Sequence, residues 1–163
     1  MTTSAITRST TLRRAAALIA AIGWLALALQ MLVTVTLTLR AEQSLPVALW
    51  RYAGYFTILT NVLMAMTMTR VARGRLVVAS AREASTVTGV VLAIAIVGVV
   101  YEVLLSAVVP PMGPVWWTAD RMLHYVVPTL AVLWGWCSCP RTRSACAIPC
   151  DGSPIPWPTS CMH

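Results

Sequence analysis

Apolar residues gather in four long runs between residues 15 and 136, and short polar segments separate these runs. The runs cover residues 15–39, 47–69, 85–109 and 120–136. A helix rises about 1.5 Å per residue and a bilayer core is about 30 Å thick, so about 20 apolar residues can cross it. The first three runs reach that length, and the fourth is shorter. The pattern predicts an all-α fold, a polytopic membrane bundle of four transmembrane helices.

Composition agrees with this class of protein. The chain is 58% hydrophobic and only 10% charged, and its mean hydropathy is +0.76. Soluble domains carry about 25% charged residues. We therefore expect membrane lipids to be the main surroundings of the chain.

The net charge of +7 follows the predicted helix ends rather than forming a nucleic-acid surface. Cytoplasmic loops of membrane proteins are rich in basic residues. Basic residues dominate the amino terminus (Arg8, Arg13, Arg14), the second loop (Arg70, Arg73, Arg75, Arg82) and the segment after the fourth run (Arg141, Arg143). The opposite segments carry only Arg40, Arg51 and Arg121. We predict a protein of the cell (inner or plasma) membrane with a cytoplasmic amino-terminal tail at residues 1–14, and no nucleic-acid partner.

The first run is expected to stay in the mature protein. Its 25 residues exceed the apolar stretch of a signal peptide, which is about 7–15 residues long. The segment that follows, Leu39 to Glu42, lacks a convincing small-residue cleavage site. A retained membrane helix is therefore the better interpretation.

Three polar residues, Thr57, Glu102 and His124, are predicted to share one layer inside the bundle. Each lies seven or eight residues from the expected outer boundary of its helix, or about 10–12 Å below it. Asn61 follows one turn deeper on the helix face of Thr57. Ionisable groups are costly within a membrane and often mark function, so this layer is the candidate site.

A hydroxyl, an imidazole and a carboxylate at one depth can form a nucleophile with its base and orienting group. The structural alternative is that Thr57 and His124 only hold helices together, since interhelical polar contacts contribute about 0.6–2 kcal/mol each. Thr60, Thr67 and Thr69 are expected to play that role or to bond their own backbone. Glu102 is expected to carry a proton or to pair with Arg51 or Arg121.

Two segments resemble the Pr-six-Pr family of bacterial membrane proteins, which are six-helix proteins of unassigned activity. They are Tyr-Phe-Thr-Ile-Leu-Thr-Asn at residues 55–61 and Asp-Arg-Met-Leu-His-Tyr-Val-Val-Pro at residues 120–128. The pair Val100 and Tyr101, followed by Leu104 and Leu105, also suits the pattern. The resemblance covers about residues 15–134 and implies that the four runs are the first four of six helices.

That family is in turn distantly similar to the androgen-induced and FAR-17a-like proteins, which include intramembrane threonine hydrolases of fatty acid esters of hydroxy fatty acids. By this resemblance Thr57 would be the nucleophile and His124 its base, although the step from His124 to Pro128 is one residue shorter than in the animal pattern. Glu102 has no counterpart there. Two functions stay open, an intramembrane lipid-ester hydrolase and a non-enzymatic small-solute carrier, proton carrier or scaffold.

The segment from residue 137 to residue 163 differs from the rest of the chain. It holds all five cysteines and five of the ten prolines, and we expect it to be disordered. Reading plausible GC-rich codons in another frame continues the fourth apolar run and begins a fifth. We therefore expect a frameshift or truncation after Trp134, which the genomic DNA would test. The cysteine spacing predicts no metal site, and without a glycine-rich loop we expect no cofactor.

Overall fold

Helices form all the regular structure in the computed structural model of this chain, which describes residues 3–76, 81–108 and 113–138. Its elements are α1 (Thr3–Arg40), α2 (Leu45–Gly54), α3 (Phe56–Ala72), α4 (Ala81–Val100), the π-helical turn η1 (Tyr101–Leu105), α5 (Pro114–Arg121), the π-helical turn η2 (Met122–Val126) and α6 (Val127–Ser138). The all-α prediction is confirmed for these ranges. Apart from its first two residues, which end α6, the predicted 137–163 tail lies outside the described residues.

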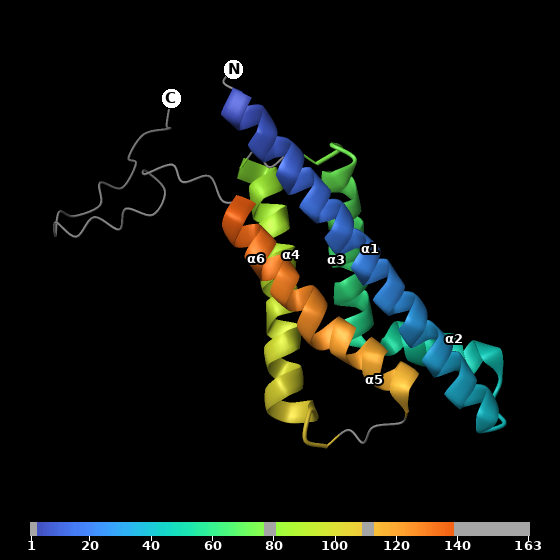
Figure 1. Cartoon of the computed structure of the whole chain (residues 1–163). Helices are drawn as coiled ribbons and strands as arrows, with labels where there is room; N and C mark the ends of the chain where they lie inside the picture. Colours follow the sequence, from blue (N-terminus) through green and yellow to red (C-terminus); the bar gives the residue numbers. More distant parts are fainter. Residues whose placement is uncertain (1–2, 77–80, 109–112, 139–163) are drawn as a thin grey trace, which may run out of the picture.

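The helices form four rods that run in alternating directions (Figure 1). The rods are α1, α3, α4 with η1, and the continuous series α5, η2 and α6. α1 crosses the face formed by the others, while α2 lies beside its far end (Figure 1). The core lies where the rods meet, and its most enclosed side chains include Met64, Met68, Ile94, Leu123 and Val127.

Hydrogen bonds connect three rods at the end of the bundle where α1 begins and α6 ends. The Arg13 guanidinium donates to the Ala72 carbonyl at the end of α3, with its Nε at 3.3 Å and its Nη2 at 3.2 Å. The Trp134 indole N–H in α6 donates to the Leu12 carbonyl in α1 at 3.0 Å. Trp134 is 5% exposed, so its ring packs between these rods.

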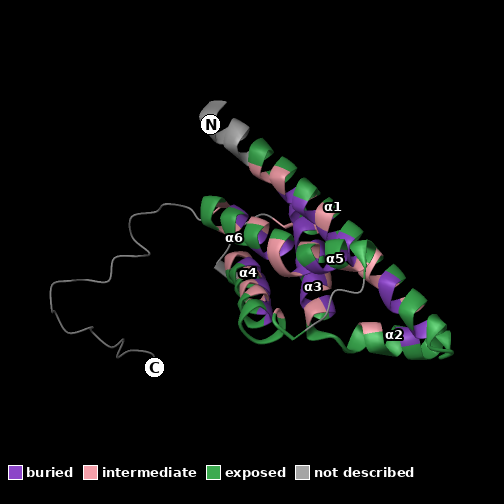
Figure 2. Ribbon diagram, turned by 60° about the horizontal axis from the view of Figure 1, so that its bottom comes forward, coloured by how far each residue is buried: buried purple, intermediate pink, exposed green. Residues whose placement is uncertain are grey.

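Exposed residues follow the outer faces of the helices (Figure 2), and many of them are large and apolar. Leu18 is 66% exposed, Leu92 60% and Val103 72%. Two helices, Thr10–Arg40 and Glu83–Leu105, are long and apolar enough to cross a membrane, while the apolar helix Phe56–Ala72 is shorter. Membrane association is thus supported for two of the four predicted spans.

The prediction of one helix over residues 47–69 is wrong. The chain leaves the helical conformation at Tyr55 (φ −78°, ψ 119°), which separates α2 from α3. Gly54 precedes the break, and glycine weakens a helix because it loses more backbone freedom than other residues. The Tyr52 hydroxyl then donates to the Leu27 carbonyl at 2.9 Å, which fixes α2 against α1.

The other predicted bounds also shift. Helices that begin with polar turns start before the apolar run, because hydropathy does not record such turns. The first helix extends to residues 3–40, and the third ends at Leu105 rather than at residue 109. The fourth begins six residues early, at Pro114. Gly113 precedes it with a φ of 121°, and proline suits the first helical turn since its missing N–H has no partner there.

The two π-helical turns each place one extra residue in a helical turn. In η2 the cause is Pro128, which has no N–H to offer the His124 carbonyl four residues earlier. Gly98 of α4 lies directly against this turn. A Cβ built on Gly98 would lie 3.0 Å from the His124 oxygen and 3.3 Å from the Pro128 Cβ. A glycine is therefore what lets α4 approach η2.

Candidate functional site

The two π-helical turns bring the polar residues of α4 and of the α5–η2–α6 rod together. Tyr101 and Glu102 begin η1, and His124 and Tyr125 lie in η2. Asp120 lies one turn before His124, at the end of α5. The site therefore forms where two helices depart from regular α geometry, which is a frequent position for functional sites.

His124 is held by Asp120 through its Nδ1 atom. That nitrogen lies 3.1 Å from Asp120 Oδ1 and 3.0 Å from the Asp120 backbone oxygen. Because an ionised carboxylate and a carbonyl only accept hydrogen bonds, these partners assign the proton to Nδ1. In the neutral imidazole Nε2 is then the acceptor, which is the state a general base requires.

Tyr101 holds both members of this pair. Its hydroxyl donates to Asp120 Oδ2 at 2.6 Å. Its ring stacks on His124, with the ring centroids 3.7 Å apart and the planes 17° apart. The side chain of His124 is 12% exposed and that of Asp120 is 9% exposed. Base and carboxylate are thus oriented by a third residue in a nearly enclosed position.

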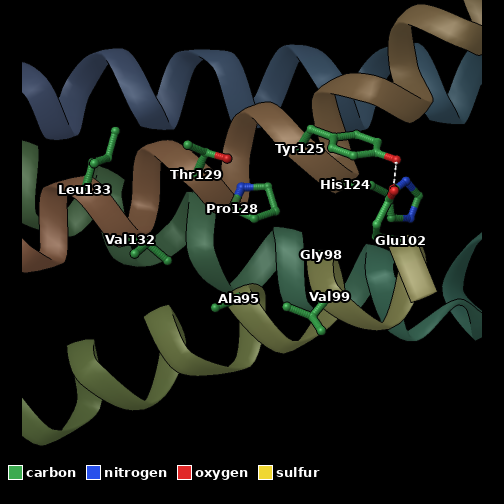
Figure 3. Close-up of a pocket in the computed structure, with 10 residues that line it drawn as sticks. All are labelled: Ala95, Gly98, Val99, Glu102, His124, Tyr125, Pro128, Thr129, Val132 and Leu133. Atoms are coloured by element: carbon green, nitrogen blue, oxygen red, sulfur yellow. Dashed lines mark hydrogen bonds between the residues drawn. The ribbon is translucent and has the colours of Figure 1, made fainter. Parts of the chain in front are cut away.

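Glu102 does not pair with an arginine in the described part of the chain, contrary to one expectation from the sequence. Its carboxylate accepts a hydrogen bond from the Tyr125 hydroxyl, as Figure 3 shows. Arg121 instead lies over aromatic rings, 4.8 Å from the Tyr125 centroid and 5.5 Å from that of Trp117. Helical spacing explains this, because Trp117, Arg121 and Tyr125 follow one another at four-residue intervals.

A groove of about 410 Å³ lies between α4 and the η2–α6 rod (Figure 3). That volume is in the range of small-molecule sites. One end is polar and the rest is mainly apolar. The lining residues are Ala95, Gly98, Val99, Glu102, His124, Tyr125, Pro128, Thr129, Val132 and Leu133. Two of the predicted site residues, Glu102 and His124, therefore face a common space.

Asn61 connects Thr57 to the His124 turn through the backbone. Its Nδ2 donates to the Thr57 carbonyl at 2.9 Å and to the Leu123 carbonyl at 3.4 Å. The residue is fully buried, and its Oδ1 has no hydrogen-bond partner among the residues that the structure describes. Asn61 is therefore an interhelical contact beside the site, as the structural alternative expects.

The Thr57 hydroxyl makes no hydrogen bond to His124 in the described part of the chain. The other threonines of α3 bond the carbonyl one turn earlier, as expected from the sequence: Thr60 to Phe56, Thr67 to Leu63 and Thr69 to Ala65. Thr57 is the second residue of α3, so no earlier turn of the same helix offers it a carbonyl. Its hydroxyl is available, and its catalytic pairing with His124 stays a prediction.

The sequence reasoning missed Asp120 and Tyr101 as the partners of His124. The four-residue step from Asp120 to His124 is a helical contact spacing and could have indicated the pair. The stacking of Tyr101 on His124 depends on how α4 packs against η2, which the sequence pattern does not give.

Comparison with known proteins adds no relative to this description. No protein-family model, curated protein or solved structure matches the chain. The resemblance to the Pr-six-Pr family therefore stays a prediction.

Proposed function

We propose that this chain is a multi-pass membrane protein whose four rods all cross the bilayer, with the amino terminus in the cytoplasm of the cell. The exposed apolar side chains of the bundle support this. Charge supports the orientation. At the end of the bundle where α1 begins, seven arginines of the described residues (Arg8, Arg13, Arg14, Arg70, Arg73, Arg75, Arg82) accompany a single acid, Glu83. At the other end, Arg40, Arg51 and Arg121 are balanced by Glu42, Glu102 and Asp120.

Reporter fusions test the orientation. Alkaline phosphatase fused after Gln43 is expected to be active and green fluorescent protein fused there to be dark. Fusions after Arg75 are expected to give the reverse, because the arginine-rich loop stays inside. Equal reporter activity at both positions would contradict the four-span arrangement, and the reverse pattern would contradict the orientation.

We propose further that the site hydrolyses an ester of a lipid, with His124 as general base. The observation that carries this proposal is the contact of His124 Nδ1 with Asp120, 3.1 Å from its Oδ1, at the end of a groove open between two helices. A fixed Nδ1 proton leaves Nε2 to accept a proton, as in hydrolases that pair a carboxylate with histidine. An apolar groove at membrane depth suits an acyl chain.

The reaction needs water and the ester alone. As the nucleophile oxygen bonds the ester carbonyl carbon, His124 Nε2 takes its proton. His124 then returns the proton to the alcohol oxygen as the carbon–oxygen bond breaks. If water is the nucleophile, a carboxylic acid and an alcohol leave in one cycle. If Thr57 is the nucleophile, an acyl-threonine forms first and a water molecule hydrolyses it by the same proton transfers.

Thr57→Ala distinguishes these two routes. In the described conformation His124 faces the groove, which favours water, while the resemblance implies Thr57. The full chain in nanodiscs would be assayed for release of p-nitrophenol from long-chain esters. If Thr57 is the nucleophile, Thr57→Ala is expected to lose activity and Thr57→Ser to retain a large part of it. Equal activity in Thr57→Ala and the unaltered chain would assign attack to water. Absence of hydrolysis by the unaltered chain would contradict the hydrolase proposal.

A further inference from the structure

The polar end of the groove is extended by a cation, Arg121, that forms no ion pair with an acidic side chain of the described residues. Arg121 lies on the same side of the η2 rod as Tyr125, with its guanidinium between the Trp117 and Tyr125 rings. Asp120, the acidic residue next to Arg121 in the chain, pairs with His124 rather than with Arg121. Arg121 is exposed, so its planar fork of donors is held in place and remains open to an anion.

We propose that the groove binds a glycerophospholipid, with its phosphate on Arg121 and one acyl chain between α4 and α6. Phosphate is favoured because arginine binds its oxygens through two parallel hydrogen bonds. Membrane surroundings supply such a lipid at the outer boundary of the bundle. This inference rests on the proposed membrane location and, for the bond that is cleaved, on the proposed hydrolase activity.

The order of groups along the rod matches the order of groups in the lipid. Arg121, Tyr125, Thr129 and Leu133 follow at four-residue steps, each about 6 Å along the helix axis. A phosphate on Arg121 therefore places the glycerol ester about one turn lower, at the level of Tyr125 and His124. The acyl chain then continues past Thr129 toward Leu133. The ester thus lies beside the base and not beside the phosphate.

The groove sets the length of chain that it holds. From Glu102 to Ala95 the wall covers seven residues of helix, or about 10 Å. An extended hydrocarbon with carbon–carbon bonds of ~1.5 Å covers this length with about nine carbons. Val99 is 63% exposed and Leu133 57% exposed, so a longer chain can leave the groove into the bilayer.

Glu102 opposes the proposed ligand. Its carboxylate lies at the polar end of the groove and is bonded to Tyr125, the same ring that Arg121 covers. A like charge near a phosphate lowers affinity. Glu102→Gln is therefore expected to strengthen phospholipid binding, whereas Arg121→Gln is expected to weaken it. A groove that bound neutral lipids would show neither change.

The test uses a phospholipid whose chains are both ether-linked, with a diazirine in one alkyl chain, so that it binds without being hydrolysed. The full chain in nanodiscs would be photolysed and the adducts mapped by mass spectrometry. We expect adducts on residues 95–99 and 129–133. Arg121→Gln removes the two guanidinium bonds and is expected to lower labelling at least about tenfold, with Arg121→Lys intermediate. Ala95→Phe fills the groove and should abolish labelling, while Ile96→Phe, which is outside the lining, should not.

Competition identifies the head group. An unlabelled phospholipid should displace the probe at lower concentration than a fatty acid of equal chain length, and a diacylglycerol should displace it least. Stronger displacement by the fatty acid would overturn the phosphate assignment. The Arg121→Gln variant must elute from size exclusion like the unaltered chain, which shows that it is folded. If its labelling is then unchanged, the proposed site is overturned. If adducts form but no ester is hydrolysed, the hydrolase proposal fails while the lipid site stands.

Discussion

His124→Ala is expected to lower ester hydrolysis by about 10²–10⁴-fold, the usual contribution of a positioned general base. Asp120→Asn is expected to cause a loss in the same range, because the amide can donate to Nδ1 and stabilise the wrong tautomer. The measurement is kcat for a long-chain ester with the chain in nanodiscs. Size-exclusion profiles would confirm that each variant is folded.

Tyr101→Phe is the matched control for these two variants. It keeps the ring on His124 and removes only the hydroxyl that donates to Asp120. We expect a loss of about 10- to 150-fold at most, since one hydrogen bond to a charged group contributes about 1.5–3 kcal/mol. A full rate in His124→Ala would contradict the role of this histidine, whatever Tyr101→Phe does.

Gly98→Ala is expected to destabilise the bundle by about 1–3 kcal/mol, the typical cost of overpacking a close contact. Its Cβ would lie 3.0 Å from the His124 carbonyl oxygen and 3.3 Å from the Pro128 Cβ. The His124 oxygen belongs to η2 and Pro128 to the first turn of α6, and as parts of one continuous helix they cannot move apart independently. Thermal unfolding in detergent, followed by tryptophan fluorescence, measures the change.

Gly89→Ala provides the comparison for this prediction. Gly89 lies in the same helix, and a Cβ built on it meets nothing within 4 Å. Alanine is favoured over glycine in a helix by about 0.5–1 kcal/mol, so this variant is expected to be more stable. Equal shifts in the two variants would contradict a close contact at Gly98.

The helices were predictable because their apolar runs are long, whereas their exact extents were not. Hydropathy merges residues 47–69 into one run, yet the backbone breaks at Tyr55. Local chain geometry decides such a break, and an average over a window of residues does not record it. The predicted start at residue 120 is late because residues 114–119 are helical but have only modest hydropathy. A hydropathy window therefore leaves them out of the run.

The candidate site was predictable in part. Glu102 and His124 stand out as ionisable residues in apolar helices, and both line the groove. Their partners follow from rotation and register, which a sequence pattern does not fix. Tyr101 contacts His124 because two helices meet at their π-helical turns. Periodicity analysis assumes 3.6 residues per turn, so it cannot foresee a residue added to a turn.

The extra residue in η2 also acts as an angular offset for everything after it. One residue corresponds to about 100° of rotation in a regular helix. Without the wide turn at Met122–Val126, α6 would present a different face to α4, and Trp134 would no longer point toward Leu12 in α1. The position of His124 and the contact of Trp134 with α1 therefore both depend on the one extra residue in this helical turn.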